Sequence, residues 1–407
     1  MAKNKIQKKK DWEVKKLGDL GDIFNGNSIN AQYKKDNYLG LKDGLKFIAT
    51  KDVSFNHKIN YENGVKIPFN EKDNFRVAKK GSVLICAEGG SSGRKMGIVN
   101  ENVTFGNKLF AFESRGSILE KFVFYFYLTE KFQKDFVLRR TGLIGGVSIK
   151  KFKEIKISFP KSLTEQKRIV KILDEVFENI EKAKENAEKN LENTKELFES
   201  YLQGVFENKD GDWEEKKLGD LGFLQTGTTP KTSEKENLGD FIPFVKPADF
   251  YKNGFLNYKN FGLSEKGSKK SRIIDKNSVL MVCIGATIGK TGFSIKEITC
   301  NQQINTFTVD PIKNCFKFFY YAMITKKFQK SVIFNSRQST LPIINKTKWS
   351  KLKVAYPKSL KTQKQIVKKL DELSEKVGEM EAILRSKIAD LDELKKSVLK
   401  KAFDGEL

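Results

Sequence analysis

The chain has 407 residues, enough for two or three domains, and its 76 lysines and arginines against 51 aspartates and glutamates give a net charge of +25. No run of 18 or more apolar residues occurs, so we expect no helix that spans a membrane. One histidine and four cysteines without CxxC spacing argue against a zinc site or a histidine-based triad, and they favour reduced thiols in a cytoplasmic protein.

The positive charge is concentrated in two parts of the chain. Residues 1–162 carry a net charge of +15 and residues 208–358 carry +13, whereas residues 163–207 and 359–407 together sum to −3. Two basic regions joined by a nearly neutral connector indicate two domains that bind a polyanion such as nucleic acid.

The sequence contains an internal duplication of about 200 residues. The opening DWEVKKLGDLGDIFNG (Asp11–Gly26) returns as DWEEKKLGDLGFLQTG (Asp212–Gly227). Short β-rich runs separated by Gly, Asn and Asp predict a mixed α+β domain in each copy. The copies do not align over 28–46 and 54–76, which predicts a shared frame with different loops and different specificities.

Each copy has a glycine-rich segment after an apolar run. In the second copy it reads GATIGKTG (Gly285–Gly292), one residue short of P-loop spacing, and the first copy reads EGGSSGRKMG. Nucleotide binding is therefore disfavoured, and a loop after a buried strand and a backbone-plus-lysine grip on DNA both stay open. Aromatic runs beginning at Phe124 and Phe318 predict core helices, and each is followed by a KFQK repeat, at Lys131 and Lys327.

Two long segments have the apolar spacing of a coiled-coil helix. The first runs from Leu163 to about Phe206 and the second from Ser359 to Phe403. Ser162 and Ser359 are the predicted N-caps. A narrow stripe on a helix of about 66 Å cannot bury itself, so each helix is expected to pack on the other. The apolar stripes include Leu197, Tyr201, Met380 and Leu394.

These patterns define the expected fold. It is of the α+β class, with two similar mixed α/β domains at residues 1–160 and 208–357. Two long antiparallel helices, at 161–207 and 358–407, separate the domains and form a coiled coil, so that the chain has an internal pseudo-twofold repeat.

Candidate DNA contacts occur at related places in both copies. Arg and Lys bind guanine edges and Asn and Gln bind adenine edges, although each residue could instead be a solvated charge or a turn-stabilising amide. In the first copy the candidates are Lys51, Ser91, Ser92, Arg94, Lys95, Lys108, Arg139 and Arg140. In the second copy they are Thr228, Lys231, Lys246, Lys290, Asn301, Gln302, Gln303, Arg337, Gln338 and Ser339.

No catalytic residue or metal ligand is predicted. The sequence lacks a [DN]PP[YF] motif, a complete GxGxxG loop and an HNH motif. We therefore expect a chain that is not itself an enzyme.

Four features together resemble the DNA specificity (S) subunits of type I restriction–modification systems. They are the W-x₃-KLGDL openings at Trp12 and Trp213, the GATIGKTG and NQQIN pair, the Pro-Lys-Ser-Leu helix starts, and the terminal LKKAFDGEL. The resemblance covers essentially the whole chain and is strongest in the second half.

The resemblance implies that each domain reads one half of a split, asymmetric target in double-stranded DNA. It implies that the paired helices set the spacing and dock two methyltransferase (M) subunits, and that a restriction (R) subunit with translocase activity joins them. S-adenosylmethionine, ATP and Mg²⁺ are expected on those partners and no cofactor on this chain. No membrane partner is expected.

Two other functions are compatible with parts of this pattern. One is a self-contained DNA-modifying enzyme, against which the missing motifs argue. The other is a coiled-coil scaffold that binds nucleic acid without regard to sequence.

Overall fold

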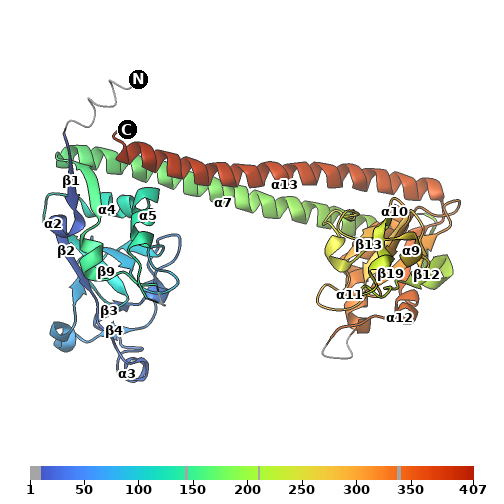
Figure 1. Ribbon diagram of the computed structural model, residues 1–407, viewed down its shortest axis with the longest axis horizontal. Helices are drawn as coiled ribbons and strands as arrows, with labels where there is room; N and C mark the ends of the chain where they lie inside the picture. The colour runs from blue at the N-terminus through green and yellow to red at the C-terminus, as the bar shows by residue number, and fades with distance from the viewer. Residues whose placement is uncertain (1–10, 143–144, 210, 337–340) are drawn as a thin grey trace. The chain divides into compact units, whose positions relative to one another are not determined.

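The computed structural model describes residues 11–142, 145–209, 211–336 and 341–407. The chain divides into two compact units, Met1–Ala187 with Ser386–Leu407, and Glu188–Arg385 (Figure 1). Each unit is one α+β domain with the adjoining halves of two long helices, α7 (Leu163–Glu207) and α13 (Leu360–Phe403). Among the described residues, no helix is long and apolar enough to cross a membrane.

The first domain is built from three sheets. Strands β1 and β10 form an antiparallel pair, a second sheet has the order β2-β9-β6-β7, and a third has the order β4-β3-β8-β5, in which β3 and β8 are parallel. The strands are β1 (Trp12–Lys16), β2 (Gly21–Asn25), β3 (Leu45–Ile48), β4 (Lys66–Ile67), β5 (Val77–Ala78), β6 (Val83–Cys86), β7 (Met96–Ile98), β8 (Val103–Phe105), β9 (Leu109–Ser114) and β10 (Lys156–Pro160). The helices are α2 (Leu17–Leu20), α3 (Ala31–Asn37), η1 (Thr50–Asp52), η2 (Phe69–Asn74), α4 (Glu120–Tyr127), α5 (Glu130–Leu138) and α6 (Ile149–Lys153).

The second domain repeats this topology. Its sheets are the pair β11-β20 and the orders β12-β19-β16-β17 and β14-β13-β18-β15, with β13 parallel to β18. The strands are β11 (Trp213–Lys217), β12 (Gly222–Thr226), β13 (Leu238–Val245), β14 (Gly262–Leu263), β15 (Ile273–Ile274), β16 (Ser278–Val282), β17 (Thr291–Phe293), β18 (Ile298–Cys300), β19 (Ile304–Val309) and β20 (Lys353–Pro357). The helices are α8 (Leu218–Leu221), η3 (Lys235–Asn237), η4 (Pro247–Asp249), α9 (Glu265–Ser268), α10 (Phe316–Ile324), α11 (Lys326–Ser336) and α12 (Lys346–Ser350). The predicted fold class and internal repeat are confirmed.

The domains differ where their sequences do not align. The first domain has helix α3 in the 28–46 segment, and the second has the short helix α9 in the segment after 251. The frame is therefore shared, and the differences lie in its connections.

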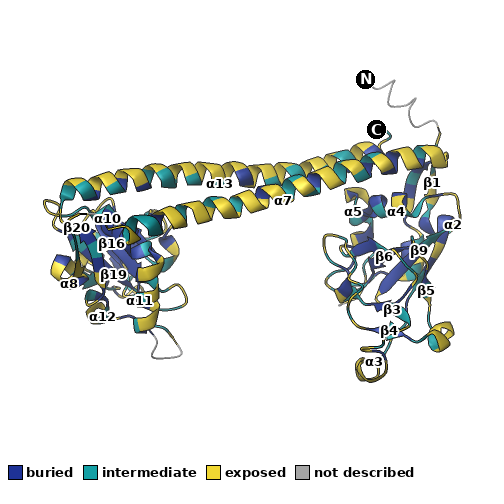
Figure 2. Cartoon of the chain, turned by 180° about the vertical axis from the view of Figure 1, so that it is seen from behind, coloured by how far each residue is buried: buried dark blue, intermediate teal, exposed yellow. Residues whose placement is uncertain are grey.

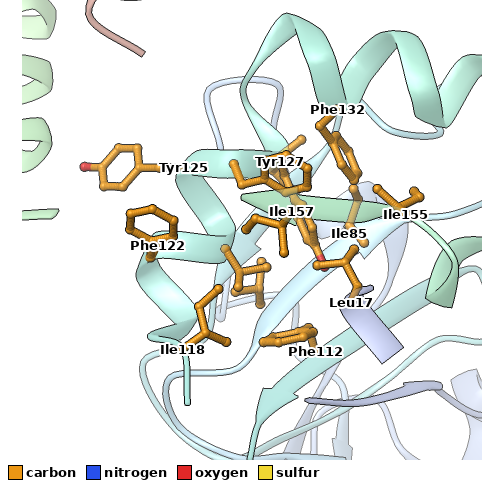
Figure 3. Close-up of a cluster of buried hydrophobic side chains, with 14 of the residues drawn as sticks. Leu17, Ile85, Phe112, Ile118, Phe122, Tyr125, Tyr127, Phe132, Ile155 and Ile157 are labelled. Carbon is orange, nitrogen blue, oxygen red and sulfur yellow. The ribbon is translucent and has the colours of Figure 1, made fainter. Parts of the chain in front are cut away.

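The aromatic runs form core helices, as predicted. On α4, Phe122, Phe126 and Tyr127 are buried, and Tyr127 stacks on Phe132 of α5 with ring centroids 4.5 Å apart. Burial of one such ring contributes about 1.5–3 kcal/mol. Figure 3 shows the rings of Tyr127 and Phe132 in one cluster with Ile85 and Ile157, and Figure 2 shows that burial follows the sheets and the inner helix faces (Figures 2 and 3).

The two long helices pair antiparallel within each unit. In the first unit the Arg168 guanidinium donates to the Leu407 carbonyl oxygen (2.7 Å), and the Lys184 ammonium donates to Asp392 (2.8 Å). Early residues of α7 therefore lie beside late residues of α13. In the second unit Leu202 of α7 shares an apolar cluster with Leu370 of α13.

Both predicted caps are present, because the N–H groups of Glu165 and Thr362 donate to the Ser162 and Ser359 hydroxyls (3.4 and 3.3 Å). The predicted stripe is only partly buried, however. Its members Leu197, Tyr201, Met380 and Leu394 are exposed by 40–60 %. Full burial on these helices occurs at positions such as Leu173 and Leu370, where a domain also packs against the helix.

Candidate nucleic-acid interface

The glycine-rich segment of the first domain is a loop fastened at both ends to the last residue of β6. The Gly93 N–H donates to the Cys86 carbonyl oxygen (2.7 Å), and the Cys86 N–H donates to the Lys95 carbonyl oxygen (2.8 Å). Gly93 has a φ of +75°, a conformation in which a side chain is strained. The loop therefore turns sharply and presents Arg94 and Lys95 directly after the turn.

The second domain builds the same loop at the end of β16. The Gly289 N–H donates to the Val282 carbonyl oxygen (2.9 Å), and the Val282 N–H donates to the Lys290 carbonyl oxygen (2.8 Å). Gly289 has a φ of +88°. A lysine thus follows the turn in both domains.

Basic segments that are distant in sequence meet at this loop in the first domain. The Lys95 ammonium donates to the Thr50 carbonyl oxygen (3.4 Å), which brings it beside Lys51 on η1. The Ala87 N–H donates to the Lys108 carbonyl oxygen (2.9 Å), so the turn before β9 also lies at the strand end. Three of the predicted cations, Lys51, Lys95 and Lys108, therefore belong to one surface.

Two other predicted residues are engaged inside this surface. Ser92 is 3 % exposed and its hydroxyl donates to the Gly145 carbonyl oxygen (2.9 Å). The Arg140 guanidinium donates to the carbonyl oxygens of Gly145 (3.1 Å) and Gly89 (3.4 Å) and to the Ser92 hydroxyl. In this geometry Ser92 and Arg140 hold two loops together, while their role in DNA contact stays a prediction.

The remaining candidates of the first domain differ in how free they are. Arg139 is paired with Asp135 one turn earlier on α5 (2.9 Å). Arg94 is exposed and its guanidinium lies 5.2 Å from the ring centre of Phe55, which is itself 57 % exposed. Ser91 is half-buried at the start of the turn. Arg94, Lys51 and Lys108 are the exposed cations among these candidates. Because the Arg94 guanidinium also donates to the Gly90 carbonyl oxygen, Lys51 and Lys108 are best placed to meet a phosphate or a base edge.

Equivalent bonds organise the second domain. The Lys290 ammonium approaches the Pro247 carbonyl oxygen (3.5 Å), as Lys95 approaches Thr50. The Cys283 N–H donates to the Gln303 carbonyl oxygen (2.7 Å), so Gln303 stands where the first domain has a lysine. The Asn301 amide donates to the Gln303 side chain (2.9 Å). Of the three predicted amides Asn301, Gln302 and Gln303, the first therefore bonds to the third.

Other predicted residues of the second domain surround this group. Thr228 is half-buried and precedes Thr229, whose hydroxyl donates to the exposed Gln302. Lys231 is exposed and lies 3.9 Å from Glu234. Three more predicted residues lie outside the described residues: Arg337, Gln338 and Ser339.

Buried aspartates that no site prediction included hold the turns that carry the cations. Asp249 accepts the N–H of Lys246 (2.7 Å), and Asp52 accepts the N–H of Ala49 (2.8 Å). The Lys246 ammonium then lies 3.8 Å from the ring centre of Phe261. Asp52 and Asp249 occupy matching positions in the duplicated sequence, and this repetition could have indicated that both hold a turn.

The thiols near these loops are held protonated. Burial raises the pKa of Cys283 and of Cys300 to about 12. Burial also raises the pKa of Cys86, although Lys95 and Lys108 act in the opposite direction. All four cysteines are free. Within the described ranges no group of three His, Cys, Asp or Glu side chains is placed to hold a metal ion.

The chain is similar to known proteins along most of its length. The family model described as "Type I restriction modification DNA specificity domain" matches residues 9–190 and again 210–388. A type I restriction enzyme specificity subunit, MjaIX of Methanocaldococcus jannaschii, is 23 % identical over 372 residues, covering 82 % of this chain and 80 % of that protein. The HindI specificity subunit of Haemophilus influenzae is 31 % identical over 148 residues, 36 % of this chain and 32 % of its own length.

Solved structures share the fold. A chain from a study of complex assembly and conformational transition of the type I R-M system has a TM-score of 0.77 at 15 % identity, covering 98 % of this chain and 99 % of that one. The HsdS subunit from Thermoanaerobacter tengcongensis has a TM-score of 0.61 at 16 % identity, covering 98 % of each chain.

The duplicated domain, its basic loop surface and the two paired helices define a DNA specificity protein built from two target-recognition domains. The chain belongs to the family of type I restriction–modification DNA specificity subunits.

Proposed function

We propose that each domain reads one half of a bipartite, asymmetric target in double-stranded DNA. The observation that carries this proposal is the loop surface at the ends of β6 and β16. Its backbone bonds are the same in both domains, while its side chains differ, for example Lys108 against Gln303. A shared frame with different polar groups fits two readers of different base sequences.

Affinity in this proposal comes largely from phosphate contacts. Many lysines and arginines would bind the backbone in a salt-dependent way and set the orientation of the chain on the duplex. Loop side chains would then add sequence selection. The net charge of +25 supports this division of roles.

The paired helices would set the gap between the two half-sites and dock two methyltransferase subunits. Support comes from the uninterrupted length of α7 and α13 and from their antiparallel pairing in each unit. A restriction subunit would complete the enzyme, in the cytoplasm. The chain itself would be non-catalytic, with S-adenosylmethionine, ATP and Mg²⁺ bound by the partners.

Methylation sequencing tests this function. The full-length chain is expressed with a type I methyltransferase subunit in a host without such methylation, and adenine methylation is mapped over the genome. We expect one motif with two specified parts and an unspecified gap of constant length. Methylation without a motif would instead favour a scaffold that binds nucleic acid regardless of sequence. Methylation when the chain is expressed without the methyltransferase subunit would favour a self-contained enzyme.

A further inference from the structure

The KFQK repeat places one glutamine at the same position in each domain. Gln133 lies on α5 and Gln329 on α11. Each helix start is anchored in the same way by a threonine hydroxyl. The Thr129 hydroxyl accepts the Phe132 N–H (3.2 Å), and the Thr325 hydroxyl accepts the Phe328 N–H (3.3 Å). Both phenylalanine side chains are buried.

Both N–H groups of each glutamine amide are used. Gln133 donates to the carbonyl oxygens of Gly93 and Tyr127, both at 2.7 Å. Gln329 donates to those of Gly289 (2.9 Å) and Met323 (2.7 Å). The amide Nε2 has two hydrogens, so each side chain forms a complete bridge from the glycine-rich loop to the end of the aromatic helix.

The turn glycine also fits closely against the same helix. A Cβ on Gly93 would lie 2.7 Å from the ring of Phe136, and a Cβ on Gly289 would collide with the Gln329 amide. The loop backbone therefore rests directly on α5 or α11. The glutamine bond fixes the carbonyl group just before Arg94 in one domain and just before Lys290 in the other.

The bridge is kept although the loops differ. The loop of the first domain has one residue more between its anchoring backbone bonds, and the two loop sequences differ. What the two copies share is the attachment, and what differs is the set of side chains that it presents. The glutamine bonds therefore position the loop in both domains and, in the proposed function, the differing loop side chains are the groups that read the DNA.

We infer that Gln133 and Gln329 are positioning residues that fix the glycine-rich loop of each domain for DNA reading. This inference rests on the proposed function. Each glutamine controls selectivity at the half-site of its own domain without touching a base, because it sets where the cation after the turn can reach.

The test compares five single variants of the full-length chain assembled with a type I methyltransferase subunit. Gln133→Met and Gln329→Met keep much of the side-chain volume but remove both donors. Gln166→Met and Gln363→Met are matched controls. These two glutamines are fully buried and bond to the carbonyl oxygens of Pro160 (2.8 Å) and Pro357 (2.9 Å) at the starts of the long helices, away from the loops.

Each assembly selects from a duplex library randomised over both half-sites, and thermal unfolding is measured in parallel. We expect Gln133→Met to reduce selectivity about tenfold at the half-site of the first domain only, and Gln329→Met to do so at the half-site of the second domain only. A loss of about tenfold is in the range that one well-placed base contact contributes. The controls should lower the unfolding temperature without a loss confined to one half. Gln133→Glu, which also lacks the donors, should reproduce the effect of Gln133→Met.

Two results would overturn the inference. If the wild type selects a two-part site and the Gln133 and Gln329 variants select it equally well, or relax both halves alike, the glutamines are merely structural. If the wild type selects no two-part site, the proposed function fails and the inference fails with it.

Discussion

Tyr125 donates its hydroxyl hydrogen to the Asp174 carboxylate over 2.6 Å, and this bond ties the aromatic helix α4 to the long helix α7. In Figure 3 the hydroxyl of Tyr125 points away from the buried cluster. The second domain repeats the bond between Tyr321 and Asp371 (2.7 Å). The attachment of domain to helix is thus part of the duplicated design.

Asp174→Ala should lower the free energy of unfolding of the first unit by about 2 kcal/mol, since a hydrogen bond to a charged group contributes about 1.5–3 kcal/mol. The ion pair of Asp174 with Lys121 (2.7 Å) is half-exposed and should add little. A double-mutant cycle with Tyr125→Phe, followed by hydrogen exchange, measures the coupling. Strictly additive effects of the two substitutions would show that the bond contributes nothing.

The only histidine should make the first unit sensitive to acid. Burial lowers the pKa of His57 to about 4, and the charge of Lys395 acts in the same direction. In the unfolded chain this histidine takes up a proton near pH 6.5, whereas in the folded chain it stays neutral down to about pH 4. Its contribution to the free energy of unfolding is therefore fully present above pH 6.5 and is lost as the pH drops towards 4, by at most about 3 kcal/mol.

His57→Asn tests this pH dependence, because Asn tolerates the φ of +65° at this position and does not titrate. Urea unfolding is compared at pH 7 and pH 4.5 for both proteins. The wild type should lose about 2–3 kcal/mol more than the variant between these two values. Equal losses would mean that His57 is not the group responsible.

Single lysines at the loops should affect affinity through phosphate contact. Lys51→Gln should weaken binding to all duplexes by similar factors and reduce the slope of log K against log salt concentration by about 1, because this lysine is exposed and placed to meet a phosphate. Lys313→Gln is the control, since this exposed lysine pairs with Asp310 (3.6 Å) away from the loop. A changed base preference with an unchanged salt slope would identify base contact instead.

The helices should act as a spacer. Inserting seven residues into α7 after Lys184 and before Ala187, with a matching insertion in α13 between Ile388 and Asp392, keeps the heptad phase and the pairing of Lys184 with Asp392. The added length of about 10 Å should increase the recognised gap by about three base pairs. Methylation sequencing measures the gap, and an unchanged gap would show that the helices do not set it.

The sequence was sufficient for features that depend on local pattern. The duplication, the caps at Ser162 and Ser359 and the aromatic core helices all follow from spacing and composition, and the structure confirms them. The resemblance to a known family supplied the expected function, because no residue pattern alone specifies DNA selectivity.

Tertiary partners could not be predicted. Ser92 and Arg140 have the chemistry of DNA contacts, but their bonds to Gly145 form only after distant loops meet. Leu197 fits the apolar stripe yet is 59 % exposed, because a two-helix seam covers only part of each stripe. The bridging role of Gln133 depends on a carbonyl group 40 residues away.

Exchange of one domain tests most directly whether each domain reads its own half-site. Each domain begins and ends with one antiparallel strand pair, and the two pairs have the same register. Trp12 lies opposite Pro160 in the first segment, Trp12–Pro160, and Trp213 lies opposite Pro357 in the second, Trp213–Pro357. A second copy of the first segment can therefore replace the second. In methylation sequencing of this chimera, we expect both parts of the motif to carry the same half-site sequence. An unchanged asymmetric motif would contradict the account.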